Sequence, residues 1–418
     1  MMKTREYATE IVKTLVRAGY TAYFAGGWVR DYILKHPSDD IDIATNAPPE
    51  VVMELFPRTI PVGIAFGVVI VMMHGHQFEV ATFRKDLNYI GGRRPEKIEL
   101  STPQEDALRR DFTINGMFFD PLTEKILDYV GGIEDLKKGI IRTIGSAHER
   151  FTEDRLRMIR AIRFASRFGF AIDIETQKAI QANAGTLFPA VAMERIWQEF
   201  NKMAKSPRFD KAIIEMQKLG LLPVIFPALE NVHEGILEER VASFNQLPKN
   251  IPAVLYLMEL FPDTPLEELL ELCQYLKTSG QEGRLVEVAF KGKQLLSKEV
   301  ESPHSIEVIE WTQFYADRFF ETCFEMIASR YPEQQRGLII ERHIERHGRL
   351  LPHIKRLAEK KPLVTAAILQ DYGIVPGKEM GALLKEAEKL VIKQDLHDPA
   401  IVVTMLKKTP LWPKGNLS

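Results

Sequence analysis

Two short stretches, GGWVRD at residues 26–31 and DIDIAT at residues 40–45, predict the fold of the first part of the chain. The first follows a β-like run and opens a helix. Gly26 and Gly27 would let backbone N–H groups approach a phosphate with no Cβ in the way. Arg30, one turn into that helix, adds a guanidinium for bidentate contact with a phosphate. A glycine pair is often only a turn, so this stretch alone is a weak indication.

The second stretch places two carboxylates one residue apart. Asp40 and Asp42 flank Ile41, and residues with this spacing on a strand point to the same face. Two unpaired carboxylates repel each other unless a cation neutralises them, and Mg²⁺ binds through one or two carboxylates together with substrate phosphates. Glu79, on another expected strand, would complete the group. The alternative is that these residues are ordinary solvent-facing strand acids.

These stretches lie in a first part that mixes helical and strand-like patterns. A helix is expected over residues 4–18, and strand-like runs follow at 21–27, 40–45, 64–73, 77–83 and 125–130. The Val- and Ile-rich run at 64–73 is typical of a buried central strand. After Gly145, apolar residues recur at helical spacing. We therefore expect the α+β class, with a mixed-sheet head at 1–140 and helical parts at 141–205, 206–325 and 326–418.

The charge is nearly balanced overall but uneven along the chain. The 418 residues are 45% hydrophobic and 27% charged, with 55 Lys and Arg against 57 Asp and Glu. This excludes a disordered or fibrous chain and predicts a soluble globular protein of more than one domain. Residues 330–418 hold 16 Lys and Arg against 10 Asp and Glu, a net charge of +6, which leaves −8 on the other 329 residues. A nucleic acid would therefore bind to a local basic surface.

Three further observations concern the compartment. Cys273 and Cys323 are too few for a disulfide framework and have no neighbouring Cys at zinc-ligand spacing, which favours a reducing cytoplasm. The longest apolar stretch, residues 60–73, is shorter than a membrane span and is interrupted by Pro61. The first 20 residues carry charges throughout, so they do not have the pattern of a signal peptide.

A third stretch, TEDRLRMIRAIR at residues 152–163, concentrates charge on a helix. Thr152 is expected to cap this helix, with two acids in its first turn. Four charged residues then recur every three positions and so lie along one helix face: Asp154, Arg157, Arg160 and Arg163. Arginines on one stripe repel each other, a cost that a bound polyanion would remove.

In order and spacing, these motifs resemble those of a known family. GGWVRD and DIDIAT resemble the nucleotidyltransferase signature of the polymerase-β superfamily. RRDFTINGMFFDP (109–121), DYVGGIEDLKKGIIRTIG (128–145) and EDRLRMIRAIRF (153–164) resemble the bacterial (class II) family of CCA-adding tRNA nucleotidyltransferases and poly(A) polymerases. The resemblance covers about residues 20–200 and implies a polymerase-β-like head followed by a helical neck, body and tail. Beyond residue 230 it rests on length and helical character.

The resemblance implies a role for each candidate residue. Asp40 and Asp42 would hold two Mg²⁺ ions, one lowering the pKa of the RNA 3′-hydroxyl and one neutralising the leaving pyrophosphate, and Glu79 would support them. The other candidates would bind the nucleotide: Gly26, Gly27 and Arg30 at the triphosphate, Arg110, Asp111 and Asn115 at the ribose and phosphates, and Arg160 and Arg163 toward the triphosphate.

Base selection would fall to Asp154 and Arg157. Cytosine and adenine both present an exocyclic amino donor beside a ring-nitrogen acceptor. A carboxylate can accept from the amino group while a guanidinium donates to the ring nitrogen. Uracil and guanine present a carbonyl and an N–H instead. One such pair would therefore accept CTP and ATP, and the expected product is CCA added to the 3′ end of tRNA.

Several activities share these motifs, and two segments bear on the choice. GIAFG at residues 63–67 departs from the Gly-basic-basic-Phe pattern of the family's poly(A) polymerases. Residues 85–98 have the full length of a flexible loop that CC-adding members lack in part. CCA addition is thus favoured, and A-only addition stays an alternative. A non-catalytic RNA-binding protein would have lost Asp40 or Asp42.

The substrate tRNA is expected to bind to basic helices near the C-terminus. An enzyme without a nucleic-acid template must recognise RNA by shape, through phosphates and 2′-hydroxyls. A helical stretch offers suitable cations: Arg342, Arg346, Arg349, Lys355 and Arg356. A solvated charged face is the alternative for any one of them. ERIW at residues 194–197 is expected to buttress the helix that carries Asp154.

Overall fold

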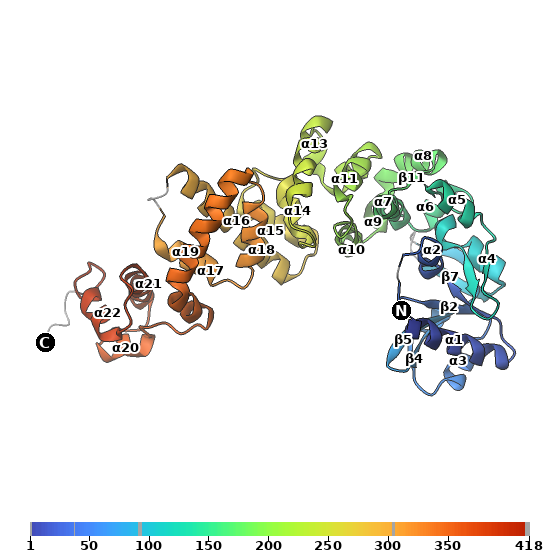
Figure 1. Cartoon of the computed structure of the whole chain (residues 1–418), viewed down its shortest axis with the longest axis horizontal. Helices are drawn as coiled ribbons and strands as arrows, with labels where there is room; N and C mark the ends of the chain where they lie inside the picture. The colour runs from blue at the N-terminus through green and yellow to red at the C-terminus, as the bar shows by residue number, and fades with distance from the viewer. Residues whose placement is uncertain (1, 37, 91–93, 303–305, 414–418) are drawn as a thin grey trace. The chain divides into compact units, whose positions relative to one another are not determined.

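The computed structural model describes residues 2–36, 38–90, 94–302 and 306–413. The chain divides into two compact units, Met1–Val241 and Ala242–Ser418 (Figure 1). The first unit contains a mixed sheet with helices, and the regular elements described in the second unit are all helices. The expected α+β class is therefore confirmed.

The first unit is built on a seven-stranded sheet in the order β3-β4-β5-β2-β1-β8-β9. Its strands are β1 Ala22–Ala25, β2 Asp42–Thr45, β3 Thr59–Gly63, β4 Val68–Met73, β5 His76–Thr82, β8 Phe118–Asp120 and β9 Lys125–Leu127. Strands β2 and β5 run parallel, and the other neighbouring pairs are antiparallel. The parallel pair at the centre brings Asp42 and Glu79 next to each other.

Two helices pack side by side on this sheet, α1 (Met2–Arg17) and α3 (Pro49–Leu55). The expected helix at residues 4–18 is α1. Its apolar residues at helical spacing, Ala8, Ile11, Val12 and Leu15, are fully buried against the sheet. Burial of each large apolar side chain contributes about 1.5–3 kcal/mol, so this stripe holds the helix in place.

Strand β4 differs from its expectation. The run at residues 64–73 was expected to form one buried central strand, but residues 64–66 form a 3₁₀ turn and the strand begins only at Val68. Gly67 has a φ of 73° and ends the turn. In the sheet, β4 is second from the edge, and burial alternates along it, with Val69 and Val71 fully buried. Only one face of β4 is covered by other residues, so the prediction of full burial from its Val-rich composition was too strong.

Residues 85–98 were expected to form a flexible loop. The structure places most of them in two antiparallel strands, β6 (Arg84–Ile90) and β7 (Arg94–Leu100), which pair with each other and not with the main sheet. Gly91, Gly92 and Arg93 lie outside the described residues. Helix α4 (Pro103–Leu108) follows, and Thr102 starts it with a capping box to Glu105.

The helical part of the first unit follows the sheet. It comprises α5 Gly132–Lys138, α6 Ala147–Glu153, α7 Leu156–Phe168, α8 Ile174–Asn183, α9 Leu187–Ala190, α10 Met193–Met203, α11 Phe209–Lys218, α12 Leu221–Ile225 and α13 Glu234–Ala242, with a short strand pair β10 Ile140–Ile141 and β11 Ala171–Ile172. Helix α7 packs against α10 and α11. Its buried apolar face includes Met158, Ile159 and Ile162.

The helix expected to start at Thr152 is interrupted. Helix α6 ends at Glu153, Asp154 is extended with φ −147° and ψ 105°, and α7 begins at Leu156. Thr152 does not cap a helix, because it lies in the last turn of α6 and its hydroxyl donates to the carbonyl of His148. The carboxylate of Asp154 accepts from the backbone N–H of Leu156 at 3.1 Å. This local bond competes with a continuous helix and places Asp154 at the break.

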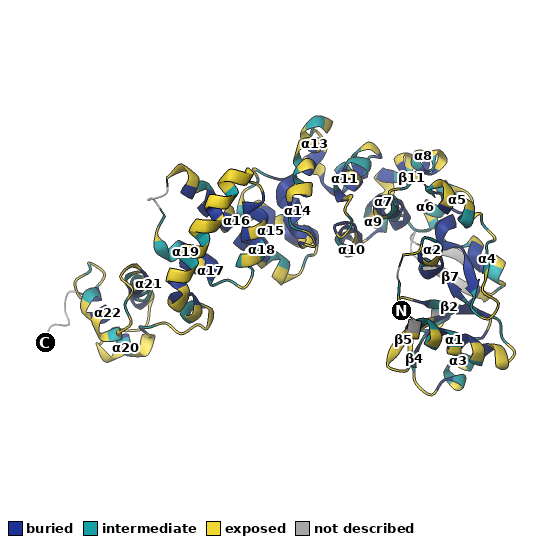
Figure 2. Cartoon of the chain, viewed as in Figure 1, coloured by how far each residue is buried: buried dark blue, intermediate teal, exposed yellow. Residues whose placement is uncertain are grey.

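The second unit is a set of packed helices. They are α14 Ala253–Leu260, α15 Leu266–Tyr275, α16 Gly280–Glu301, α17 Val308–Tyr315, α18 Phe320–Ala328, α19 Glu333–Ala358, α20 Ala366–Asp371, α21 Lys378–Lys393 and α22 Pro399–Leu406. Helix α14 is buried along its whole length, as the dark blue in Figure 2 shows. Helix α16 contacts α14, α15, α17 and α18. No helix in the described ranges is long and apolar enough to cross a membrane.

Candidate active site

One cavity of about 610 Å³ in the first unit is lined by every residue expected to bind metal or nucleotide. It lies where strands β1, β2 and β5 meet the segment after α4 and helix α7. The candidates on its wall are Gly26, Gly27, Arg30, Asp40, Asp42, Glu79, Arg110, Asp111, Asn115, Asp154, Arg157, Arg160 and Arg163. Arg84, Arg109 and Arg167, which were not among the candidates, line it as well.

The carboxylates lie at the sheet end of the cavity. In the parallel pair β2–β5, Ile43 is opposite Val80, so Asp42 and Glu79 each precede a paired residue and share a face. Asp40 is exposed and lies before β2, because the strand expected at residues 40–45 begins only at Asp42. Burial and the carboxylates of Glu79 and Asp40 raise the pKa of Asp42 to about 7. Burial and Asp40 also raise the pKa of Glu79. The group therefore carries negative charge that its surroundings leave poorly compensated.

This donor set fits a magnesium ion that is shared with substrate. Within the described ranges, no group of three or more His, Cys, Asp or Glu side chains is arranged to hold a metal ion. Asp40 and Asp42 line the same cavity and supply oxygen atoms only. Mg²⁺ prefers this combination of one or two carboxylates with water and phosphate oxygens.

The turn between β1 and α2 (Gly27–Ile33) requires glycine at its first position. Gly26 has φ 67° and ψ −126°, which side chains rarely allow. A Cβ at Gly26 would also lie 3.1 Å from Nη1 of Arg110. Gly27 is less constrained, because a Cβ there would make an ordinary contact of 3.4 Å with Arg30. The glycine at position 26 therefore makes room for an arginine of the cavity wall.

Arg30 is part of the wall and not a projecting side chain. It is 3% exposed. Its Nη1 donates to Oδ1 of Asn115 at 2.6 Å, and its Nε donates to Oδ1 of Asp31 at 2.8 Å. The guanidinium carbon lies 4.7 Å from the ring centre of Phe168. Arg30 thus contributes positive charge from a fixed position.

Asp106 on α4 organises two arginines of the cavity and was missed by the sequence analysis. Arg109 donates through Nε and Nη2 to Oδ1 at 2.9 and 2.6 Å, and Arg110 donates through the same atoms to Oδ2 at 3.1 and 2.9 Å. Asp106 is 1% exposed. Burial alone would raise its pKa, but the charges of Arg110 and Arg109 lower the pKa of Asp106. Its spacing of three and four residues before the arginines was a usable signal.

Asp111 connects the segment after α4 with helix α7. Its Oδ2 accepts from Nε and Nη2 of Arg160 at 2.9 and 2.6 Å. Its Oδ1 accepts from Nδ2 of Asn115 at 3.1 Å and from the backbone of Phe112. Burial acts to raise its pKa, but Arg160 and Asn115 lower the pKa of Asp111 to about 2. Three candidates from different motifs thus form one network.

Each arginine of the α7 stripe has a carboxylate partner. Arg157 contacts Glu153 at 2.6 Å, and Arg163 contacts the buried Glu199 of α10. Arg160 is held by Asp111. The repulsion along the stripe is therefore already offset inside the protein. The sequence pattern alone did not show these carboxylates, so it left the repulsion to be removed by a bound polyanion.

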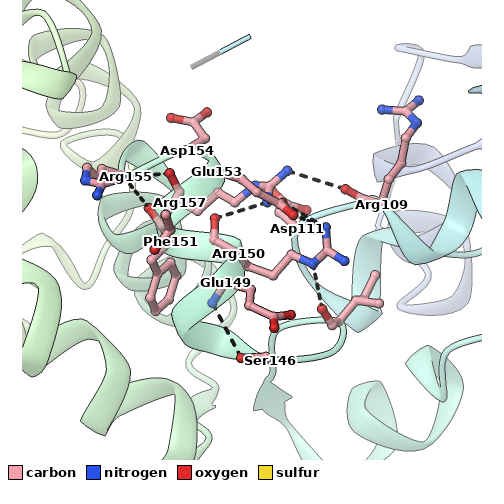
Figure 3. A network of polar contacts seen from close by, with 12 residues as sticks. Arg109, Asp111, Ser146, Glu149, Arg150, Phe151, Glu153, Asp154, Arg155 and Arg157 are labelled. Atoms are coloured by element: carbon pink, nitrogen blue, oxygen red, sulfur yellow. Dashed lines mark hydrogen bonds and ion pairs between the residues drawn. The ribbon is translucent and has the colours of Figure 1, made fainter. Parts of the chain in front are cut away.

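Asp154 and Arg157 are held separately. In Figure 3 the carboxylate of Asp154 points away from Glu153 and Arg157. Its Oδ2 accepts from Nη2 of Arg195 at 3.0 Å. Arg195 belongs to the segment expected to buttress this helix, and its neighbours Ile196 and Trp197 are buried. The buttress therefore includes an ion pair to a candidate residue.

The basic stretch near the C-terminus is partly used within the second unit. Arg346 pairs with the buried Glu299, donates to the hydroxyl of Tyr315 and lies over the ring of Trp311. Arg356 pairs with Glu388. These two arginines therefore also contribute to helix packing, and their expected contact with RNA stays a prediction. The exposed members of the stretch are Arg342, Arg349 and Lys355.

Two family models match parts of this chain. Residues 22–142 match the family described as the poly A polymerase head domain, and residues 169–232 match the probable RNA and SrmB-binding site of polymerase A. The CCA-adding enzyme of Anoxybacillus flavithermus is 44% identical over 242 residues, which are 58% of this chain and 60% of that protein. That of Bacillus cytotoxicus is 42% identical over 245 residues, with the same coverage. The chain thus spans about 60% of the length of the curated relatives it matches.

Solved structures match over more of the chain. The Bacillus stearothermophilus CCA-adding enzyme in complex with CTP has a TM-score of 0.77 and 27% identity, and the match covers 97% of this chain and 98% of that one. The Thermotoga maritima CCA-adding enzyme complexed with tRNA has a TM-score of 0.62 and 20% identity, over 95% and 93% of the two chains, which shows a shared fold. Residues 22–142 therefore match the poly A polymerase head-domain family, and the chain is similar to CCA-adding enzymes in sequence over 58% of its length and in fold over 97%.

Proposed function

We propose that this protein adds CCA to the 3′ end of tRNA from CTP and ATP and releases pyrophosphate. The observation that carries the proposal is that the carboxylates of β2 and β5 share one cavity with the Asp154–Arg163 stripe of the helical part. A nucleotide triphosphate needs a metal-binding group at one end and a base-reading group at the other. The relatives named above are CCA-adding enzymes, which supports this choice.

Asp40 and Asp42 are the residues that would hold Mg²⁺, with Glu79 beside them. When bound, two Mg²⁺ ions lower the pKa of the RNA 3′-hydroxyl and neutralise the leaving pyrophosphate. Glu79 and Asp42 share a face of the sheet, so Glu79 would keep the negative potential at the site high. The 3′-oxygen forms a bond to the α-phosphorus, and the bond from that phosphorus to pyrophosphate breaks.

The arginines of the cavity would bind the triphosphate. Arg110, Arg160 and Arg163 are each anchored by a carboxylate, so their guanidinium groups are oriented before the nucleotide arrives. An anchored guanidinium loses little conformational entropy on binding phosphate. Arg30, Gly26 and Gly27 would contact the triphosphate from the wall of the cavity. Asn115 and Asp111 would contact the ribose and phosphates.

Asp154 and Arg157 would select the base. Asp154 would accept from the exocyclic amino group of cytosine or adenine, while Arg157 would donate to the adjacent ring nitrogen. Glu153 would orient Arg157, because Oε2 of Glu153 lies 2.6 Å from Nη1 of Arg157. Exposed cations of the second unit, Arg342, Arg349 and Lys355, would contact the RNA phosphates. The proposal keeps the cytoplasm as the location, in line with two free, buried thiols.

Incubation with Mg²⁺ and defined RNAs tests the proposal. The substrates are tRNA lacking all of CCA, tRNA lacking only the final A, and an unrelated RNA, each with CTP and ATP separately and together. We expect complete CCA on the first tRNA and A on the second. Long A tails on the unrelated RNA would favour a poly(A) polymerase, and failure to add C would leave A-only addition.

A pair of neighbouring variants tests the assignment of the metal ligands. Asp40→Ala should abolish every addition, because it removes one of the two carboxylates. Asp39→Ala, one residue away and also exposed, is the matched control and should retain activity. Addition by Asp40→Ala at the wild-type rate would refute the assignment.

A further inference from the structure

We infer that Arg195 is a specificity-determining positioning residue, which fixes the acceptor position of Asp154 that selects the exocyclic amino group of the incoming base. The inference rests on the proposed function, since it concerns how the same cavity distinguishes nucleotides. Arg195 is not among the residues that line the cavity, whereas Asp154 is. Arg195 would therefore act through Asp154 and not on the nucleotide directly.

The contacts of Asp154 leave it little freedom. Its Oδ1 accepts from the backbone N–H of Leu156 at 3.1 Å and from Nη1 of Arg195 at 3.4 Å. Its Oδ2 accepts from Nη2 of Arg195 at 3.0 Å. A carboxylate offers about four lone-pair positions, two on each oxygen. Within the described part of the chain these contacts use three of them, so the position that remains is on Oδ2.

The remaining acceptor position on Asp154 can accept one hydrogen bond, which matches a single N–H of the base. Cytosine and adenine direct one amino hydrogen toward the edge that carries the ring nitrogen, whereas uracil presents a carbonyl oxygen there. Because the fork of Arg195 contacts both oxygens of Asp154, it fixes the rotation of the carboxylate and hence the direction of that position. A carbonyl oxygen brought to the same place would face a carboxylate oxygen and be repelled.

Arg195 also keeps Asp154 apart from the arginines of α7. The negative charge of Asp154 reaches Arg160, where it acts to raise the pKa of that guanidinium. Without Arg195, a carboxylate at the break between α6 and α7 would turn toward the cationic stripe. The carboxylate of Asp154 would then form ion pairs with the guanidinium groups that should bind the nucleotide. The ion pair thus prevents the two base readers from neutralising each other.

The backbone of Arg195 is well placed for this role. It lies in the first turn of α10, and the next two residues, Ile196 and Trp197, are 0% and 4% exposed. Helix α10 packs on α7, the helix that Asp154 precedes. The two side chains are 22% and 18% exposed, so their ion pair is only partly screened by solvent. A rigid support of this kind is what a positioning residue needs.

The test compares CTP with UTP in Arg195→Gln, which keeps hydrogen-bonding groups and removes the charge. Addition to tRNA lacking CCA gives kcat/KM for each nucleotide, and calorimetry without RNA gives their binding constants with Mg²⁺ present. We expect the ratio of CTP to UTP to fall about tenfold or more in both measurements, the size expected for one misplaced charge-assisted hydrogen bond. Addition of C by the variant should continue, because the carboxylates of the sheet are untouched.

Two further variants separate positioning from stability. Arg142→Gln removes an arginine that pairs with Asp135 and Asp173 and does not line the cavity. It should leave the CTP to UTP ratio unchanged. Arg195→Lys restores the positive charge but not the paired N–H donors of the guanidinium. It should recover less than half of the lost preference for CTP over UTP, measured as the logarithm of the ratio.

Three outcomes would overturn the inference. One is an unchanged ratio in Arg195→Gln, even if its stability falls. Another is an equal loss of the ratio in Arg142→Gln. The third is full recovery by Arg195→Lys, which would show that charge suffices without orientation. Absence of any nucleotide addition by the wild-type protein would instead refute the proposed function, so the two failures are distinguishable.

Discussion

The carboxylate of Asp111 accepts two hydrogen bonds from the guanidinium of Arg160, at 2.9 and 2.6 Å. The two residues are 49 positions apart in the sequence, one after helix α4 and one on α7. The ion pair ties the sheet part of the first unit to the helix that carries the arginine stripe. Its strength therefore bears on both stability and the shape of the cavity.

This ion pair predicts a loss of stability in acid. The pKa of Asp111 is lowered from 3.8 to about 2, so the ionised form stabilises the folded protein fully above pH 4. The stabilisation should disappear as the pH falls from about 4 to about 2 and the folded carboxylate gains its proton. A shift of this size corresponds to about 2 kcal/mol.

Comparison of the wild type with Asp111→Asn checks this prediction. Urea unfolding should show a difference of about 2 kcal/mol at pH 6 that shrinks steadily below pH 4. The exposed pair Lys178–Glu175 provides the control, since Glu175→Gln should leave the stability nearly unchanged at every pH. A difference between wild type and Asp111→Asn that stays constant down to pH 2 would contradict the assigned pKa.

Asp42 predicts the opposite dependence on pH when no metal is bound. Its pKa is raised from 3.8 to about 7, so it stabilises the folded state most below pH 3.8 and this contribution is lost as the pH rises through 7. Without metal, Asp42→Asn should therefore be more stable than the wild type at pH 8, by on the order of 1–3 kcal/mol, and should lose this advantage near pH 4.

Thermal unfolding at pH 8, with EDTA and with Mg²⁺, measures this effect. Mg²⁺ should raise the Tm of the wild type and have little effect on Asp42→Asn, because binding to the folded state alone stabilises it. Asp39→Asn serves as the neighbouring control and should respond to Mg²⁺ like the wild type. An equal response of Asp42→Asn would exclude Asp42 as a ligand.

Gly26→Ala should impair nucleotide binding as well as stability. The substitution strains a backbone with φ 67° and puts a Cβ 3.1 Å from Arg110, which must then move. We expect a loss of about 1–3 kcal/mol in stability. We also expect KM for CTP and ATP to rise about tenfold, because a displaced cation no longer matches the phosphates.

Gly19→Ala is the matched control for this variant. Gly19 has φ 89° and nothing within 4 Å of an added Cβ, so it shares the backbone strain without the contact to an arginine. Its stability should fall by a similar amount while KM stays unchanged. If both variants raise KM equally, backbone strain alone explains the effect and the crowding of Arg110 is irrelevant.

In the second unit, Arg346 and Arg342 should behave differently. Arg346→Met leaves Glu299 buried without its partner and should cost about 3–5 kcal/mol of stability. Arg342→Met changes an exposed side chain and should alter stability by less than about 0.5 kcal/mol. It should weaken tRNA binding and reduce the salt dependence of log Kd by about one unit.

Filter binding of tRNA across a salt series, with urea unfolding of the same samples, separates the two roles. Glu341→Gln, next to Arg342 and also exposed, is a control that should not weaken binding. The assignment of Arg342 to RNA contact fails if its substitution leaves both affinity and salt dependence unchanged.

Local sequence rules were sufficient for most of the site. The pattern at residues 40–45 predicted a strand, which forms over Asp42–Thr45 with Asp40 before it. The glycine turn before α2 was found at Gly26, because both predictions depend on residues close in sequence. The helical stripe of Arg157, Arg160 and Arg163 was found for the same reason. These predictions needed only the periods of strand and helix.

The partners of these residues depend on contacts between distant segments. Glu199 is 36 positions from Arg163, and Arg195 is 41 positions from Asp154. No pattern of period two or 3.6 relates such residues. The break at Asp154 was missed for a related reason. A helix-like apolar spacing continues through it. The hydrogen bond of Asp154 with Leu156 and its ion pair with Arg195 mark the break, and the ion pair joins distant segments.

By itself, then, the sequence determined which residues carry the charges of the site and on which element most of them lie, because strand alternation and helical period act over a few residues. Only the tertiary structure decided how the charges far from a local partner are held: that Asp111 anchors Arg160, that Glu199 anchors Arg163, and that Arg195 on α10 pairs with Asp154. The physical reason is that burial makes an unpaired charge costly, so each must find a partner, and packing of distant helices decides which partner is near enough.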